Sequence, residues 1–80
     1  MTKQIDIKEL IPFMRKGYVT MDKSGEWVWW EKKPVKDIYA DMWVKSKALV
    51  GAWVFLNSLF NIKPVSDWTK SLIKVENKDE

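Results

Sequence analysis

Two residue types are missing from this chain: it contains no cysteine and no histidine. The lack of cysteine excludes disulfide scaffolds, thiolate metal sites, iron–sulfur clusters and thiol nucleophiles. The lack of histidine removes the commonest metal ligand and the commonest general base. The carboxylates of Asp37 and Asp41, four residues apart, have no catalytic partner in the sequence. We therefore expect no metal, no cofactor and no catalytic residue, and a protein that acts by binding rather than as an enzyme.

A marked excess of charge of one sign is also missing. The 14 basic and 11 acidic side chains leave a net charge of +3. Residues 1–40 carry eight basic and six acidic side chains, and residues 41–80 carry six and five. Dedicated nucleic-acid modules concentrate their positive charge, because affinity rises with the number of phosphates neutralised. We therefore expect a protein partner in preference to a nucleic acid.

Long hydrophobic runs are absent as well. The longest uncharged stretch, residues 48–62, has 15 residues and is interrupted by Gly51, Asn57, Ser58 and Asn61. A membrane-spanning helix needs about 20 predominantly apolar residues. The first residues show no apolar signal region. We expect no membrane association and a cytoplasmic location.

Large apolar side chains are abundant instead. Hydrophobic residues make up 46% of the 80 positions, and six of them are tryptophan. A chain of this length buries only about 60% of the surface that its unfolded form exposes, so large side chains must supply the core. We expect a single domain over residues 1–76, followed by a frayed charged tail over residues 77–80.

The first segment, residues 5–14, has the spacing of a helix with one apolar face, formed by Ile7, Leu10, Ile11 and Met14. Asp6 and Glu9 are spaced as a capping box. Pro12 removes one backbone hydrogen bond, so we expect about two turns that end or kink just after it. Gly17 is expected to close the helix with a positive φ.

The clearest local signal is a β-hairpin over residues 18–30. Asp22 and Gly25 occupy the first and last positions of a type I turn with a left-handed glycine bulge. With Asp22 opposite Glu26, the predicted pairs are Met21 with Trp27, Thr20 with Val28, Val19 with Trp29 and Tyr18 with Trp30. Because side chains alternate between the faces of a strand, one face carries Val19, Met21, Trp27 and Trp29, and the other carries Tyr18, Thr20, Val28 and Trp30. We expect the helix to cover only one of these faces.

The middle of the chain is ambiguous. Residues 35–47 fit either a helix or a loop followed by a strand that begins near Met42, and we favour the loop and strand. Residues 48–56 are rich in β-branched and aromatic residues, which indicates a buried strand or strand pair. We therefore place Trp43 and Trp53 in the core.

The last third of the chain indicates two short strands. Residues 59–64 form a short strand stopped by Pro64, and residues 66–75 form a turn that runs into a closing edge strand. The expected fold is α+β: one short N-terminal helix packed on a small antiparallel sheet of three to five strands.

Two segments, residues 15–34 and 60–76, carry a recognisable pattern. Its parts are a Gly17-Tyr-Val19 strand, an Asp22-x-x-Gly25 hairpin into a tryptophan-rich strand that ends at Lys33-Pro34, and a block made of Ile62-Lys-Pro64, Asp67-Trp68 and Leu72-Ile-Lys-Val75. In these parts the chain resembles a group of very short phage and prophage proteins. The resemblance implies a phage origin and a location in the cytoplasm of a bacterial host, and it brings no catalytic residues.

A smaller similarity rests on a helix, a glycine-aromatic strand and the C-terminal Asp67-Trp68 followed by a strand. It connects the chain with small phage anti-defence proteins that sequester nucleotide signals or block CRISPR effectors. The leading interpretation is a phage accessory protein, with a role in anti-defence or host takeover, that binds a host protein through an aromatic face. The alternative is a nucleic-acid or nucleotide binding module that stacks bases on tryptophan inside a rim of lysines.

The candidate binding surface is the Trp30 side of the hairpin. If the helix covers Trp27 and Trp29, Trp30 is the more available ring, and exposed tryptophan often dominates a protein interface. If the third strand pairs with the second, nearby lysines form a basic rim; otherwise they protect strand edges from aggregation. The predicted binding residues are Tyr18, Val28, Trp30, Lys32, Lys33 and Lys45. A hairpin that is apolar on both faces also predicts a homodimer.

Overall fold

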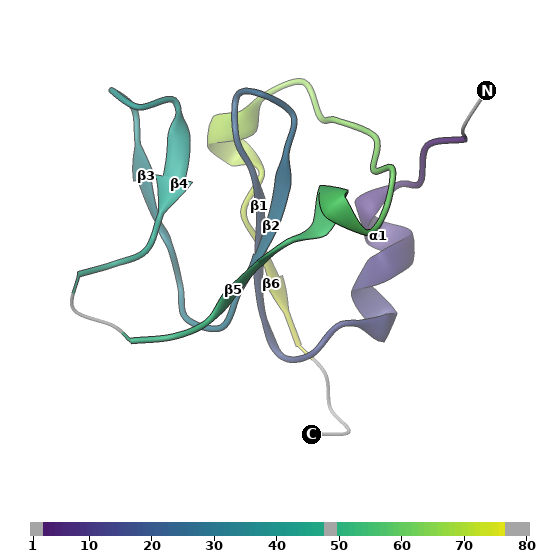
Figure 1. Ribbon diagram of the computed structural model, residues 1–80, viewed down its shortest axis with the longest axis horizontal. Helices are drawn as coiled ribbons and strands as arrows, with labels where there is room; N and C mark the ends of the chain where they lie inside the picture. Colours follow the sequence, from purple (N-terminus) through teal and green to yellow (C-terminus); the bar gives the residue numbers. More distant parts are fainter. Residues whose placement is uncertain (1–2, 48–49, 77–80) are drawn as a thin grey trace.

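The computed structural model describes residues 3–47 and 50–76. A four-stranded antiparallel sheet has the strand order β5-β2-β1-β6, and a separate two-stranded sheet consists of β3 and β4. The N-terminal helical segment and the smaller sheet lie on opposite sides of the main sheet (Figure 1). The predicted α+β class is confirmed, with four strands in the main sheet. The separate second sheet was not predicted.

The elements follow one another in chain order as α1 (Ile7–Leu10), the 3₁₀ turn η1 (Ile11–Phe13), β1 (Gly17–Met21), β2 (Trp27–Trp30), β3 (Val35–Asp37), β4 (Met42–Val44), β5 (Trp53–Phe55), the 3₁₀ turns η2 (Leu56–Ser58) and η3 (Trp68–Lys70), and β6 (Ile73–Val75).

The short N-terminal helix is confirmed. The Asp6 side chain accepts a hydrogen bond from the Lys8 N–H at 2.9 Å, which satisfies one of the free N–H groups of the first turn. After Leu10 the helix tightens into η1, where Pro12 occupies an early position that needs no N–H donor. The prediction for Gly17 is wrong. This glycine lies in β1 and does not close the helix with a positive φ.

The register predicted for the β1–β2 hairpin is confirmed at all four pairs. Gly25 has a φ of 93°, and its N–H donates to the Asp22 carbonyl at 2.9 Å. The Asp22 N–H donates to the Glu26 carbonyl at 3.0 Å, which closes the glycine bulge. The turn therefore determines the alternation of every side chain on the two strands.

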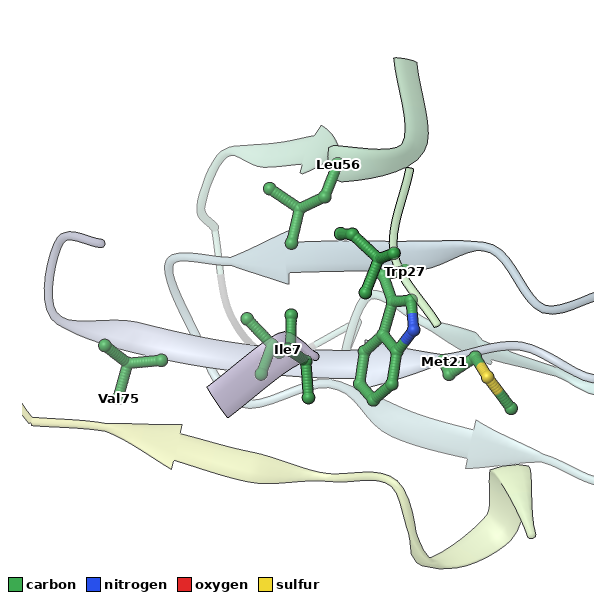
Figure 2. Packing of buried hydrophobic residues seen from close by; sticks show 7 residues of the cluster. Ile7, Met21, Trp27, Leu56 and Val75 are labelled. Atoms are coloured by element: carbon green, nitrogen blue, oxygen red, sulfur yellow. The ribbon is translucent and has the colours of Figure 1, made fainter. Parts of the chain in front are cut away.

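One face of the hairpin supports the main hydrophobic core. Trp27 is fully buried at its centre (Figure 2), and its indole N–H donates to the Lys63 carbonyl at 3.2 Å. The buried residues around it come from the helix, from two other strands and from the segment after β5: Ile7, Val19, Met21, Leu56, Ile62 and Val75. The helix therefore covers one face of the hairpin, and that face is the Trp27 side.

The other face of the hairpin holds a smaller core cluster. Val28 and Trp30 of β2 pack there with Trp43 of β4, and Trp68 packs partly against both clusters. The Trp30 indole N–H donates to the Thr20 hydroxyl at 2.9 Å, so the polar end of the ring is satisfied inside the protein. The predicted core position of Trp43 is confirmed.

The middle of the chain differs from the prediction in three respects. Val35–Asp37 is a strand rather than a loop, and it pairs with β4. The third strand does not pair with the second, because β5 occupies the free edge of β2. The strand predicted to be buried is exposed: Trp53 of β5 is 48% exposed, so its predicted core position is wrong. The predicted 48–56 segment includes residues 48 and 49, which lie outside the described residues.

The C-terminal part follows the prediction more closely. Asp67 caps η3, and β6 pairs with β1 at the edge of the main sheet, which confirms the turn and the closing strand. Residues 59–64 form no full strand; Ile62 makes a single parallel bridge with Ile5. The predicted tail, residues 77–80, lies outside the described part of the chain.

Gly17 of β1 lies too close to Trp29 and Trp30 of β2 to carry a side chain. A Cβ at Gly17 would overlap the backbone oxygen of Trp30 and would lie 2.8 Å from the Trp29 indole nitrogen. A Cβ at Gly51 would approach the flexible Lys32 side chain, at 2.8 Å from Cγ. We expect Gly17→Ala to lower the free energy of unfolding by about 1–3 kcal/mol or more, and Gly51→Ala to change it by less than about 1 kcal/mol. Urea unfolding of both variants tests this. Equal losses would contradict the role given to Gly17.

Candidate functional site

A groove lies on the Trp30 side of the main sheet, between β5 and β4. Its cavity has a volume of about 220 Å³. We call it the apolar groove, and it is lined by Asp22, Val28, Trp30, Met42, Trp43, Val44, Lys45, Trp53 and Phe55. Seven of these nine side chains are apolar or aromatic, so the groove suits an apolar ligand group.

The floor and one wall of the groove follow from the pairing of β2 with β5. Trp53 lies opposite Trp30, and Phe55 lies opposite Val28. Directly paired residues share a face of a sheet, so these four side chains point to the same side. The rings of Trp53 and Trp30 have centroids 6.4 Å apart, and those of Trp53 and Phe55 are 4.8 Å apart in an edge-on arrangement. Trp53 and Phe55 remain 48% and 40% exposed.

The opposite wall is β4, and hydrogen bonds attach its hairpin to the β1–β2 turn and to η3. The Trp43 N–H donates to the Asp22 carboxylate at 2.8 Å, and the Trp43 indole N–H donates to the Trp68 carbonyl at 3.1 Å. The Lys23 N–H donates to the Asp41 carbonyl at 3.1 Å. Because these bonds hold the wall on two sides of Trp43, the groove is formed before any ligand binds.

Asp22 is the one acidic side chain that lines the apolar groove. Burial raises the pKa of its carboxyl group above the ordinary value of 3.8, and the hydrogen bond from the Trp43 N–H opposes this shift in part. The two effects have opposite signs because burial penalises the charged form, whereas the bond stabilises it. Asp22 thus links the hairpin turn to β4.

A second hollow, of about 410 Å³, lies at the other end of the hairpin. We call it the basic cleft, and it is lined by Lys16, Gly17, Tyr18, Glu31, Lys32, Lys33, Lys74 and Val75. Four lysines face one acidic side chain there. This arrangement favours an anionic ligand over a neutral one.

The six predicted binding residues do not form one site. Three of them, Val28, Trp30 and Lys45, line the apolar groove. The other three line the basic cleft: Tyr18, Lys32 and Lys33. The tryptophan and most of its expected lysine rim are separated because β5, and not the lysine-bearing third strand, pairs with β2.

The prediction that Trp30 is the available ring is wrong. Its side chain is only 7% exposed, because Trp43 packs over it and Thr20 accepts its N–H. Within the apolar groove, the exposed aromatic rings are those of Trp53 and Phe55, and the exposed Met42 faces them from the opposite wall. The alternation of Trp53 and Phe55 is visible in the sequence, but their exposure depends on the position of β5 at the sheet edge.

The carboxylates considered as catalytic candidates have structural partners. The Asp37 side chain accepts from the Ala40 N–H at 3.1 Å, and Asp41 forms an ion pair with Lys23 at 3.5 Å. Within residues 3–47 and 50–76, no cluster of three acidic side chains is placed to hold a metal ion. Over the same residues, no helix has the length and apolar character required to cross a bilayer.

Comparison with known proteins returns no match: no family model, no curated protein and no solved structure matches this chain.

The two tryptophans of the apolar groove should differ in their contribution to stability. We expect Trp30→Ala to lower the free energy of unfolding by about 3–5 kcal/mol, as deletion of a buried aromatic ring does. Trp53→Ala should cost about 1–2 kcal/mol, since about half of its surface is already in solvent. Thermal and urea unfolding measure both. A larger loss for Trp53→Ala would contradict the assignment of floor and wall.

The raised pKa of Asp22 predicts a pH dependence of stability. The folded state binds the Asp22 proton more tightly than the unfolded state, so this group favours folding below pH 3.8 and loses that contribution as the pH rises through its raised value. Asp22→Asn keeps an oxygen for the Trp43 N–H and cannot ionise. We expect the stability of the variant relative to the unmodified protein to increase from acidic to neutral pH. Urea unfolding at a series of pH values measures this, and a difference independent of pH would contradict it.

Proposed function

We propose that this protein is a phage-encoded accessory protein that binds a host protein without catalysis, in the cytoplasm of a bacterial host, through the apolar groove. The observation that carries the proposal is the exposed aromatic wall of Trp53 and Phe55 beside a preformed cavity. Tryptophan and other aromatic side chains dominate the energetics of protein interfaces. The phage origin, with a role in anti-defence or host takeover, is supported by the sequence resemblance described above.

The size of the groove favours a protein side chain over a small molecule. Its volume of about 220 Å³ lies below the roughly 300–1,000 Å³ of pockets that enclose drug-sized ligands. A cavity of this size accommodates one large apolar side chain. We therefore expect the partner to insert a single aromatic or aliphatic anchor between Trp53 and Met42.

The charge near the groove favours an acidic neighbour for that anchor. Lys45 is exposed and lines the groove, whereas the Asp22 carboxyl group is buried and hydrogen-bonded. An acidic residue next to the anchor would therefore form a solvent-exposed ion pair with Lys45. Such pairs at the rim of an interface act more on orientation and association rate than on affinity.

The basic cleft supports a second candidate function, the binding of nucleic acid or a nucleotide. Lys32 and Lys33 lie there with Tyr18, which offers one aromatic ring near the positive charge. Phosphate binding of this kind weakens steeply as salt is added. This candidate ranks second because no tryptophan lines the cleft, so base stacking would depend on Tyr18 alone.

Capture from nuclease-treated bacterial lysate tests the proposed function. We expect one stoichiometric protein to be retained by the unmodified chain and lost with Met42→Lys, which places a charge in the wall of the groove at a cost of about 2 kcal/mol or more in binding. Met42 belongs to β4, so this change leaves β5 intact.

The matched control is Ile38→Lys. Ile38 is an exposed apolar residue between β3 and β4, and it does not line the groove. This variant should retain the partner. Loss of the partner in both variants, or in neither, would contradict binding through the groove. If nuclease treatment of the lysate removes every retained partner, the result favours the second candidate, nucleic-acid binding. Nucleic-acid binding that weakens steeply with added salt, and that Lys32→Glu reduces, would place that binding in the basic cleft.

A further inference from the structure

The main sheet has two edges, and only one is protected by charge. At β6 the exposed Lys74 forms an ion pair with Glu76 at 3.3 Å. At β5 the strand lies within residues 48–62, which contain no charged side chain. Natural proteins usually place lysine, proline or a bulge on an exposed edge strand to prevent pairing with another chain. Within the described residues, no strand covers the outer side of β5.

The hydrogen-bond alternation shows which groups of β5 point outward. The Asp22 N–H bonds to the Glu26 carbonyl, and hydrogen-bonded pairs alternate with non-bonded pairs along an antiparallel ladder. The backbone N–H and C=O groups of Val28 and Trp30 in β2 therefore point toward β1. The backbone groups of the alternate residues, such as Trp29, point toward β5. The hydrogen bond from the Glu31 N–H to the Ala52 carbonyl, at 2.9 Å, agrees with this pattern.

In β5 itself, Val54 therefore faces β2, and the backbone groups of Trp53 and Phe55 point away from the sheet. The Phe55 carbonyl accepts from the Ser58 hydroxyl at 2.8 Å and retains a second lone pair. The outer edge of β5 thus presents two N–H donors and two carbonyl acceptors.

Both faces of the sheet carry apolar side chains beside this edge. On one face, Trp53 and Phe55 line the apolar groove. On the other face, Val54 and Ala52 line a hollow of about 370 Å³ together with Trp29. An added strand covers both hollows only if its side chains are apolar at successive positions. β5 has such a sequence, Trp53-Val-Phe55.

We propose that a second copy of this chain pairs antiparallel with β5 about a twofold axis at Val54. In this register, Trp53 lies opposite Phe55 of the partner subunit, and the outward backbone groups of both strands form hydrogen-bonded pairs. Isologous pairing of this kind is the commonest form of protein assembly. Because β5 carries no charged side chain, pairing with its own copy places no like charges opposite each other.

The dimer extends the binding surface of each chain. Directly opposite residues share a face of a sheet, so the apolar grooves of the two copies lie on the same side of one eight-stranded sheet. Trp53 and Phe55 then line the groove of their own chain and border that of the other. This inference goes beyond the proposed function, and it concerns the purified chain alone.

Cysteine pairing tests the register, because the chain has no other cysteine. At the twofold axis the two Val54 positions form a pair with a Cα separation of about 4.5 Å, which permits a disulfide. Ala52 lies on the same face and is also exposed, but its two copies would be four residues apart along the strands, about 13 Å. After mild oxidation with diamide, Val54→Cys should form a disulfide-linked dimer, and Ala52→Cys should form no disulfide between its copies.

A proline tests the backbone pairing. Phe55 has a φ of −76°, which proline adopts without strain, so Phe55→Pro removes the outward N–H without changing this backbone angle. Phe55→Ala removes the same ring and keeps the N–H. By sedimentation equilibrium, we expect the unmodified chain to approach twice its 9.5 kDa mass at high concentration. The dimer dissociation constant of Phe55→Pro should exceed that of Phe55→Ala by at least about tenfold.

A chain that stays monomeric at every concentration overturns the proposal, even if it retains a host protein through the groove. Equal crosslinking of the two cysteine variants, or equal dissociation constants for Phe55→Pro and Phe55→Ala, also overturns it. If Phe55→Pro fails to fold, the cysteine pair alone decides. Since no host protein is present in these measurements, a dimer without partner capture would leave the inference standing and count against the proposed function.

Discussion

The structure depends on the need to cover both faces of one hairpin. Strand β2 carries large apolar side chains at consecutive positions, so Trp27 points to one side and Val28 and Trp30 to the other. A hairpin exposed to water on either side would leave a large aromatic surface unburied, and a chain of 80 residues buries too small a share of its surface to offset that loss. Each face therefore needs its own cover from another part of the chain.

The two covers differ in how they are attached. On the Trp27 side, the short helix and the segment around Ile62 supply apolar contacts, and the parallel bridge between Ile5 and Ile62 holds them together. On the Trp30 side, the cover is the β3–β4 hairpin, and Asp22 and Trp68 hold it by accepting hydrogen bonds from Trp43. The second cover needs these polar attachments because it pairs with no strand of the main sheet.

The candidate site is a consequence of the limited extent of the second cover. Trp43 reaches Trp30 and Val28, but the neighbouring residues of β5 stay exposed, and the space between β4 and β5 becomes the apolar groove. The same edge position leaves the outer backbone groups of β5 without a neighbouring strand in the described part of the chain. The proposed binding surface for another protein and the proposed pairing edge for a second copy thus arise from one feature of the fold.

The amino-acid sequence by itself determined the features that depend on neighbouring residues. The Asp6 cap, the Asp22–Gly25 turn and the register of β1 with β2 involve groups a few positions apart, where turn geometry and side-chain alternation leave one solution.

Tertiary structure alone decided that Trp30 is buried and Trp53 exposed. Both residues are tryptophans in apolar stretches, and their burial depends on which distant segment lies against each face. The Gly17 position shows the same limit: its sequence context fits a helix end, but the close approach of Trp29 and Trp30 requires glycine within a strand. Contacts of this kind are chosen by the packing of the whole chain, because many pairings of short apolar segments have similar local energies and differ only in the total surface that they bury.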